Sequence, residues 1–284
     1  MLALGCRDQS RPLVAPRRRT VRRGGAVSAW RERVEIAGGR AVLYLGDCRE
    51  IVPTLQPFDC LLTDPPYSSG GAFRGDRAQP VATKYVQTTS EWTSRADFAG
   101  DTRDQRAFLA WASMVFSDAY AVAAPGATCM VFSDWRQLPT MTDAVQCGGW
   151  VWRNLVTWWK PGIRMQRGRF SSSAEYLVYG SKGPVAEGAG SPQNVIRCAP
   201  VGGEEKQHIA EKPVSLLRQL LEVTPPTALV LDPFAGSGTT AAACLAAGRR
   251  FVGIELDPAH FATACRRIAE AARQPDLLIP ETAA

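Results

Sequence analysis

The sequence has few of the residues that bind metal ions or build disulfide frameworks. It contains only two histidines, His208 and His260, and its eight cysteines are scattered without a Cys-x-x-Cys pair. Zinc sites and disulfide-stabilised folds both need clusters of these residues. We therefore predict a protein that binds no metal and works in a reducing cytoplasm.

Long apolar runs and one class of phosphate-binding loop are missing as well. No apolar stretch approaches 18 residues, which predicts that no segment crosses a membrane. No Gly-Lys-Ser or Gly-Lys-Thr sequence is present, and this excludes a P-loop. We also find no internal repeat.

The composition otherwise fits a globular, positively charged protein. With 284 residues, of which 45% are hydrophobic, the chain can bury a full core as one large or two small domains. The net charge of +6 suits a polyanionic partner. Residues 1–33 hold nine arginines and predict a disordered basic arm ahead of an ordered domain, 34–284. This arm is either a contact to nucleic-acid phosphates or a solvated tail.

A tetrapeptide with distinctive chemistry, Asp64-Pro65-Pro66-Tyr67, follows the apolar run 60–62. The run predicts a buried strand of a parallel sheet, and open α/β sheets place their ligand crevice at the carboxyl ends of such strands. The two prolines stiffen the turn and leave carbonyl groups free to accept hydrogen bonds. A carboxylate, carbonyl acceptors and an aromatic face together suit a planar ring that carries an exocyclic NH2 group.

A glycine-rich loop later in the chain predicts a second site element. An apolar strand, 228–231, runs into Asp-Pro-Phe-Ala-Gly-Ser-Gly-Thr-Thr, followed by a helix, 239–247, and a strand, 251–254, that ends at Glu255. The amino end of the helix attracts an anion. Glu255 lies about 20 residues beyond the glycines, where a Rossmann-type unit places its ribose-binding acid. At this point a dinucleotide fits the pattern equally well.

A third strand end carries Asp47, after the predicted strand 42–45. We expect this strand to lie beside the strand that carries Asp64. Asp47 is then either a site residue or the cap of the short helix that follows it.

Basic residues gather in two connecting segments. Residues 68–103 are polar, without steady periodicity, and begin directly after Tyr67. Basic and aromatic residues are interleaved there, which favours a flap that closes on nucleic acid over a mobile loop with ordinary charges. The second segment, 160–169, joins the predicted strands 151–159 and 175–179 and carries four positive charges and no negative one. We expect it to contact phosphates.

The remaining pattern is that of alternating helices and strands. Helical spacing of apolar residues predicts helices at 105–124, at about 135–147 and from Lys212-Pro213 to just before Pro225-Pro226. A further strand is predicted at 128–132. Residues 183–191 are small and glycine-rich, which indicates a flexible connection.

The two motifs together resemble those of the amino-group DNA methyltransferases, which methylate adenine N6 or cytosine N4. The resemblance extends from about Val34 to Ile268, and the Asp-Pro-Pro-Tyr motif precedes the glycine-rich loop, as in the β group of that family. It implies an α/β fold, namely a Rossmann-like sheet dependent on S-adenosylmethionine (AdoMet), with helices on both faces and a circularly permuted motif order. It also implies small target-recognition segments at about 160–173 and 181–207.

The resemblance assigns roles to residues at matching positions. The expected catalytic residues are Asp64, Pro65, Pro66 and Tyr67. The expected AdoMet-binding residues are Asp47, Cys48, Lys212, Asp232, Phe234, Ala235, Gly236, Ser237, Gly238, Thr239, Glu255 and Leu256. From the two basic segments, the expected DNA contacts are Arg74, Arg77, Lys84, Lys160, Arg164, Arg167 and Arg169.

The implied activity is methyl transfer to N6 of an adenine flipped out of double-stranded DNA. Aspartate at the first position of the tetrapeptide is more usual in the adenine enzymes. Two alternatives remain open: a cytosine-N4 methyltransferase, and a catalytically silent DNA-binding regulator that keeps the fold. We expect a homodimer, because the recognition segments of one subunit are small and two-fold symmetry matches a palindromic site. The sequence does not identify the recognition site or a restriction partner.

Overall fold

The computed structural model describes residues 28–67, 103–163, 167–168, 170–185, 190–201 and 212–273, together with the backbone of residues 17–20. The predicted flap at 68–103 lies outside the described residues, except for Arg103.

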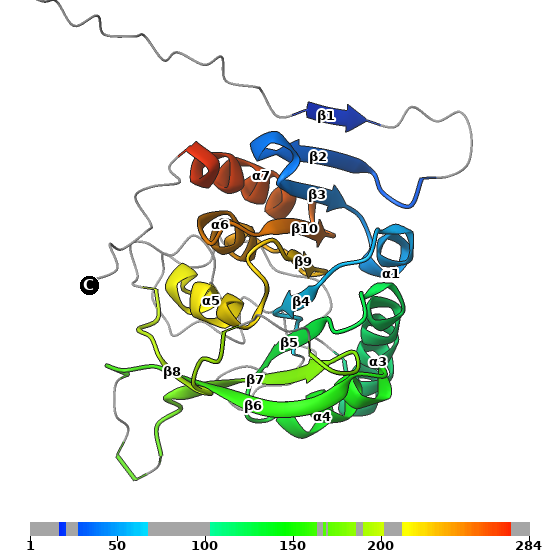
Figure 1. Cartoon of the computed structure of the whole chain (residues 1–284). Coiled ribbons are helices and arrows are strands. Elements are labelled where there is room, and N and C mark those ends of the chain that lie inside the picture. Colours follow the sequence, from blue (N-terminus) through cyan, green and yellow to red (C-terminus); the bar gives the residue numbers. More distant parts are fainter. Residues whose placement is uncertain are drawn as a thin grey trace, which may run out of the picture.

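One ten-stranded sheet runs through the described part of the molecule, in the order β1-β2-β3-β10-β9-β4-β5-β7-β6-β8 (Figure 1). The five central strands, from β3 to β5, are parallel, whereas β7 runs antiparallel to β5 and β6. The strands are β1 (Arg17–Thr20), β2 (Glu32–Ile36), β3 (Ala41–Leu45), β4 (Cys60–Thr63), β5 (Thr128–Ser133), β6 (Val151–Trp159), β7 (Ala174–Ser181), β8 (Val195–Arg197), β9 (Leu229–Asp232) and β10 (Arg250–Glu255).

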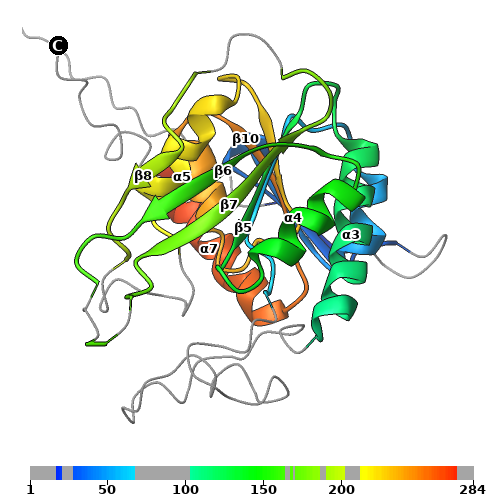
Figure 2. The same ribbon diagram turned by 90° about the horizontal axis from the view of Figure 1, so that it is seen from below.

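Helices cover both faces of this sheet, as Figures 1 and 2 show. One face carries α1 (Cys48–Ile51), α3 (Gln105–Val122) and α4 (Leu138–Cys147). The other carries α5 (Val214–Leu220), α6 (Thr239–Ala246) and α7 (Pro258–Arg273). Short 3-10 helices are η1 (Ala37–Gly39), η2 (Val52–Thr54) and η3 (Leu221–Val223). The predicted α/β architecture with helices on both faces is confirmed.

The apolar run of β4 belongs to both cores of this three-layer arrangement. Cys60 and Leu62 pack in the core on the α6 side, and Leu61 packs in the core on the α3 side. Successive side chains of a strand point to opposite faces, so a strand covered on both faces is apolar throughout. This is why the run lacks the alternation of a half-exposed strand.

The centre of the sheet is a topological switch point. Strands β4 and β9 are neighbours, but the chain continues from β4 to β5 on one side and from β9 to β10 on the other. Their following helices, α3 and α6, lie on opposite faces. Open α/β sheets bind ligands in the crevice at such a point, outside the carboxyl ends of the strands. The two sequence motifs follow these two strands.

The structure differs from the sequence-based expectations in several places. Asp47 does not stand beside the strand of Asp64, because β10 and β9 lie between β3 and β4. Helix α4 begins at Leu138 instead of about Trp135, since the Asp134 side chain accepts backbone N–H groups after β5 and forms a turn there. The sheet also extends into residues 1–33, where β1 pairs with β2. Strands β2 and β8 and helix α7 were not predicted.

Candidate active site

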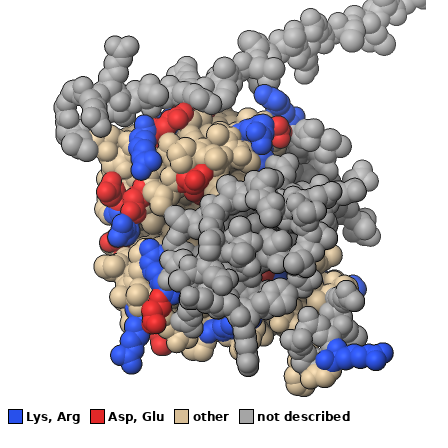
Figure 3. Space-filling view, turned by 180° about the vertical axis from the view of Figure 1, so that it is seen from behind, with Lys and Arg blue, Asp and Glu red and all other residues tan. Residues whose placement is uncertain are grey.

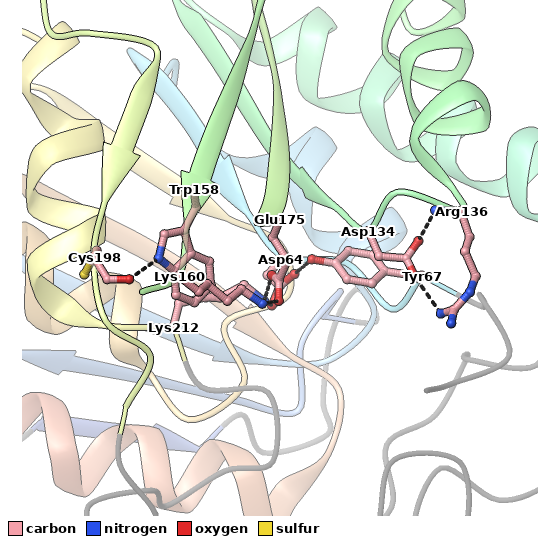
Figure 4. A network of polar contacts seen from close by, with 9 residues as sticks. All are labelled: Asp64, Tyr67, Asp134, Arg136, Trp158, Lys160, Glu175, Cys198 and Lys212. Atoms are coloured by element: carbon pink, nitrogen blue, oxygen red, sulfur yellow. Dashed lines mark hydrogen bonds and ion pairs between the residues drawn. The ribbon is translucent and has the colours of Figure 1, made fainter. Parts of the chain in front are cut away.

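The Asp64 carboxylate lies at the carboxyl end of β4 and has both oxygens engaged by side chains (Figure 4). Oδ1 accepts the hydroxyl of Tyr67, three residues further along the turn. Oδ2 accepts Nζ of Lys212, which precedes α5 and lies 2.6 Å away. The first and last residues of the tetrapeptide are therefore joined to each other and to the Lys-Pro pair.

Lys212 also belongs to a chain of alternating charges that reaches into the outer strands. Its Nζ lies 3.3 Å from Oε2 of Glu175 at the start of β7, and the other oxygen of Glu175 is paired with Lys160, directly after β6 (Figure 4). The Lys212 side chain is only 9% exposed. Because β7 runs antiparallel to its neighbours, its first residues lie at the same edge of the sheet as the carboxyl ends of β4 and β6.

Burial and these ion pairs set the ionisation of the network. Burial raises the pKa of Asp64, and the neighbouring ammonium of Lys212 opposes that rise. Burial would lower the pKa of Lys212, but the carboxylates of Asp64 and Glu175 together raise it. For Glu175, the two lysines outweigh burial and lower the pKa. The ammonium of Lys212 thus stays charged between two carboxylates.

Asp232 at the end of β9 holds the two central strands together. It is 2% exposed, and its Oδ1 accepts the hydroxyl of Thr63 on β4 at 2.7 Å. Oδ2 accepts the hydroxyl of Thr240 on α6 at 2.7 Å, and Oδ1 also accepts the Phe234 amide at 3.1 Å. Burial raises the pKa of this carboxyl to about 6. Its observed contacts are all internal, although the sequence predicts a residue near the cofactor.

Glu255 ends β10 and faces the glycine-rich loop. Its two oxygens accept the amides of Gly236 at 2.8 Å and of Asp257 at 2.9 Å. Burial raises the pKa of Glu255 to about 7, although these amide donors oppose the rise. The side chain remains partly exposed, so its unused lone pairs can accept hydroxyl groups of a ligand.

The two glycines of this loop have different reasons for being glycine. Gly236 has φ of +52° and open space around the position of a Cβ atom, with only the Phe234 carbonyl oxygen at 3.9 Å. Gly238 has φ of +84°, and a Cβ atom there would meet Ala264 of α7 at 3.1 Å. Gly238 therefore allows α6 to pack closely against α7, and Gly236 leaves open space beside the backbone.

Asp47 caps the amino end of α1, which was one of its two interpretations from the sequence. It accepts the Arg49 amide at 2.9 Å and the Arg49 guanidinium at 2.6 Å, and the Arg49 hydrogen bonds lower its pKa. Its strand β3 pairs in parallel with β10, with Leu45 opposite Glu255. Asp47 thus lies at the same edge of the sheet as Glu255, one strand away.

An aromatic contact that sequence reasoning missed covers the glycine-rich loop. The Trp111 ring of α3 lies 5.5 Å from the Phe234 ring, and the Arg103 guanidinium lies 4.2 Å above Trp111. Trp111 reads in the sequence as one of several apolar residues at helical spacing, so only its size distinguishes it.

The other predicted cofactor residues differ in their exposure to solvent. Cys48 and Ala235 are buried, and Leu256 is exposed. The hydroxyl groups of Ser237 and Thr239 accept Nη1 of Arg267 from α7, at 2.7 and 3.3 Å. These contacts fix the loop from the α7 side.

The predicted DNA contacts fall into three groups. Lys160 is paired with Glu175 and lies 4.6 Å from the centre of the Trp158 ring, instead of standing in solvent. Arg167 is exposed. The remaining five lie outside the described residues: Arg74, Arg77, Lys84, Arg164 and Arg169.

Glu175 is the functional candidate that sequence reasoning missed. The sequence shows it as the first polar residue of a predicted strand, next to a connector rich in positive charge. A negative charge beside this positively charged connector was the only local sign of an ion pair. Its partner Lys212 is 37 residues away along the chain, and local patterns do not reveal such a pair.

The surface of the described residues carries mixed charge. On the face in Figure 3, lysine and arginine side chains lie beside acidic ones and do not form one large positive patch of described residues. Within the part of the chain that the structure describes, no helix is long and apolar enough to span a membrane. The same part holds no group of three or more His, Cys, Asp or Glu residues suited to a metal ion.

Known proteins resemble this chain in sequence and in fold. YubD, a protein of Escherichia coli (strain K12), is 28% identical over 253 residues, which cover 84% of this chain and 97% of YubD. The crystal structure of the M1.HpyAVI-SAM complex is 24% identical, with a TM-score of 0.58, over 80% of this chain and 98% of that one. The PvuII DNA methyltransferase (cytosine-N4-specific) is 16% identical, with a TM-score of 0.57, over 83% and 92%.

A match to a family model identifies the family of this chain more firmly than these single relatives do. The model described as DNA methylase, which covers N6 and N4 enzymes, matches residues 58–194 and 186–266. The match includes the tetrapeptide, Glu175, Lys212 and the glycine-rich loop, and it spans more than half of the sequence. The chain therefore belongs to the N6/N4 family of DNA methylases.

Proposed function

We propose that this protein transfers a methyl group from AdoMet to N6 of adenine in double-stranded DNA, as a β-group enzyme. The observation that carries the proposal is the meeting of two motifs at the switch point of the sheet. Asp64 to Tyr67 follow β4, and the loop with Gly236 and Gly238 follows the adjacent strand β9. A base on the first motif and a methyl donor on the second would then be neighbours.

The residues around the glycine-rich loop fit AdoMet. Glu255 has free lone pairs for the ribose hydroxyls, and the open side of Gly236 leaves room for close approach to the backbone. The amino end of α6 suits the ligand carboxylate. The M1.HpyAVI structure of the same fold was determined with SAM, which supports this choice. The internal hydrogen bonds of Asp232 support a role in shaping the loop.

The chemistry needs orientation more than acid–base catalysis. AdoMet supplies a methyl group that its sulfonium already activates. An adenine amine is a weak nucleophile because its lone pair is delocalised into the ring. Asp64 and the Pro65 carbonyl, by accepting one N–H each, would favour a pyramidal nitrogen whose lone pair points toward the methyl group. The transfer would form an N–C bond as the S–C bond of AdoMet breaks, with S-adenosylhomocysteine as the leaving group, and the nitrogen would release one proton to water.

The base must leave the duplex to reach this position. Flipping costs a few kcal/mol, and stacking on the aromatic ring of Tyr67 would offset part of that cost. Tyr67 keeps its ring in place through its hydroxyl contact with Asp64. Burial raises the pKa of Tyr67 well above its usual value, so the hydroxyl stays protonated and remains a donor.

The choice of adenine over cytosine is tested directly by the product. DNA methylated by the purified protein is digested to nucleosides and analysed by mass spectrometry, and we expect N6-methyladenine. The first-position aspartate of the tetrapeptide supports adenine, whereas one structural relative is a cytosine-N4 enzyme. A digest with N4-methylcytosine as its sole methylated base would overturn the adenine assignment. A digest without any methylated base would overturn the proposed function.

We expect AdoMet binding to depend on pH through Glu255. Because the pKa of Glu255 in the free protein is about 7, the group is protonated below that value. An ionised carboxylate accepts ribose hydroxyls more strongly. The overall affinity for AdoMet should therefore fall as the pH drops below about 7, by up to about tenfold per pH unit, and should level off above that value.

The measurement is AdoMet affinity by calorimetry at pH 6, 7 and 8. Glu255→Gln should remove most of this slope, and Glu255→Ala should weaken binding at pH 8 by about 1–3 kcal/mol. Equal slopes for the wild type and Glu255→Gln would take Glu255 out of the cofactor site.

An exposed tryptophan beside the catalytic turn is a candidate DNA contact. Trp135 follows β5, is 57% exposed and lies 5.1 Å from the Arg136 guanidinium. Base–aromatic stacking contributes about 1–3 kcal/mol per base, and arginine adds phosphate attraction. We expect Trp135→Ala to weaken the binding of plasmid DNA about tenfold or more. Fluorescence anisotropy of a labelled DNA fragment, with the unlabelled plasmid as competitor, measures this affinity.

The chain offers a matched control for this substitution. Trp152 is 45% exposed but starts β6, at the opposite edge of the sheet from the carboxyl ends of β4 and β5. Trp152→Ala should leave DNA affinity within twofold. If both variants bind DNA equally well, the edge that carries Trp135 is not the DNA-facing edge.

The working unit in this proposal is a homodimer. The recognition segments available to one subunit are small, and a second subunit enlarges the reading surface and matches a palindromic site. Sedimentation velocity at micromolar concentration, with and without DNA, separates a dimer from a monomer. A fully active species of about 31 kDa bound one-to-one to DNA would contradict the dimer.

A further inference from the structure

The proposed catalytic carboxylate is already occupied in the free protein. Oδ2 of Asp64 accepts the ammonium of Lys212 at 2.6 Å, and Oδ1 accepts the hydroxyl of Tyr67. The amino group of a target base is an N–H donor of the same kind as the ammonium. If Asp64 receives that amino group, as the proposed function requires, the incoming N–H donor approaches an oxygen that the positively charged ammonium of Lys212 already engages.

A second carboxylate lies next to Lys212, and one of its oxygens makes only a long ion pair with the ammonium. Oε2 of Glu175 is 3.3 Å from Nζ of Lys212, yet it is buried and accepts no hydrogen bond from the described residues. The other oxygen of Glu175 is held by Lys160. Buried acceptors without donors are unfavourable, so Oε2 is an acceptor that a donor would stabilise.

Among the described residues, Lys212 has no third partner of comparable strength. Its side chain is 9% exposed, so bulk water cannot readily replace Asp64 as the partner of the ammonium. The Phe132 ring lies 5.0 Å from Nζ and the Tyr67 ring 5.7 Å from it, and both attract a cation. A shift of about 0.5 Å toward Glu175 would reach the ~2.8 Å distance of a charge-assisted hydrogen bond.

We propose that Lys212 is an exchangeable placeholder that occupies Asp64 in the free protein and transfers its hydrogen bond to Glu175 when the base arrives. Glu175 is then a positioning residue for the reaction: it receives Lys212 and frees Asp64 for the amino group. Lys160 holds Glu175 in place from the other side. This proposal rests on the proposed function, because it needs Asp64 to bind the amino group.

The first test removes the second carboxylate. In Glu175→Gln, Lys212 has one carboxylate left and stays on Asp64, so the KM for unmethylated plasmid DNA should rise at least tenfold. AdoMet affinity should stay within twofold, because Glu175 lies away from Glu255 and the glycine-rich loop. The matched control is Glu35→Gln, a paired glutamate on the distant strand β2, which should leave both constants unchanged.

The decisive variant is the double substitution Glu175→Gln with Lys212→Met. Removal of the competitor should restore at least tenfold of the lost activity at pH 8.5 relative to Glu175→Gln alone, measured at saturating AdoMet because Lys212 is also an expected AdoMet-binding residue. The alkaline pH is needed because Asp64 loses the neighbouring positive charge that keeps it ionised in its buried position. A residue that only supports the fold would show no such rescue.

The outcomes separate this inference from the proposed function. A wild-type protein that methylates no base would end the proposed function itself. A methylating wild type with normal constants in Glu175→Gln, or with no recovery in the double variant, would overturn the exchange. Circular dichroism melting checks the fold of each variant. If Glu175→Gln does not fold, a structure of the wild type with bound DNA decides: Nζ nearer Glu175 supports the exchange, and Nζ still on Asp64 overturns it.

Discussion

Replacement of Asp64 by alanine should lower methyl transfer to DNA by about a thousandfold, comparable to the loss of a preorganised charge-stabilising group. The variant removes the carboxylate that would orient the amine. AdoMet affinity should change by no more than a few-fold, since Glu255 and the loop around Gly236 are untouched. The fold should survive, because Glu175 can still pair with Lys212.

A tritium-transfer assay and equilibrium binding of AdoMet measure the two quantities separately. Asp143→Ala, an exposed aspartate on α4, is the matched control and should behave as the wild type does. Full methyl transfer by the Asp64 variant would remove this residue from the reaction. A parallel loss of AdoMet affinity would instead place Asp64 in the cofactor site.

The largest effect on stability is expected for Asp232→Ala. The substitution leaves two buried donors, the hydroxyls of Thr63 and Thr240, and the partly buried amide of Phe234 without an acceptor. Each buried donor left unsatisfied costs about 1–3 kcal/mol, so the free energy of unfolding should fall by about 3–5 kcal/mol. Urea denaturation followed by circular dichroism measures this change.

Asp232→Asn is the informative comparison. Its side-chain carbonyl keeps one acceptor, so it should lose less stability than the alanine variant does. Equal stability of the wild type and Asp232→Ala would mean that the hydrogen bonds between β4, β9 and α6 do not hold the switch point together.

Local sequence pattern predicted the elements that carry the site. The apolar run of β4 and the loop after β9 are continuous in sequence, and their composition follows from burial on both faces and from tight turns. The strand ends at Asp64 and Glu255 were therefore predictable. Short elements at the margins were not: β8 has three residues, too few for a period to be recognised.

Contacts between distant segments were beyond local pattern. The order of strands places β10 and β9 between β3 and β4, and nothing in the sequence near Asp47 reveals this. Likewise, the pair of Asp64 and Lys212 joins residues separated by 148 positions. The charge run 160–169 predicts contacts to phosphates, and only the fold shows that Lys160 turns back to Glu175.

The position of β9 and β10 in the sheet has a consequence for how the protein folds. These strands are the last of the sheet to be synthesised, yet they occupy its centre, with β10 between β3 and β9 (Figure 1). The hydrogen bond from Thr63 to Asp232 spans 169 positions along the chain. Closure of such long loops slows folding, and strand edges that wait for partners are prone to aggregation. While the ribosome is still translating the region before residue 229, the nascent chain holds the catalytic turn on a β4 that lacks its β9 neighbour, and only the arrival of β9 and β10 completes the sheet around it.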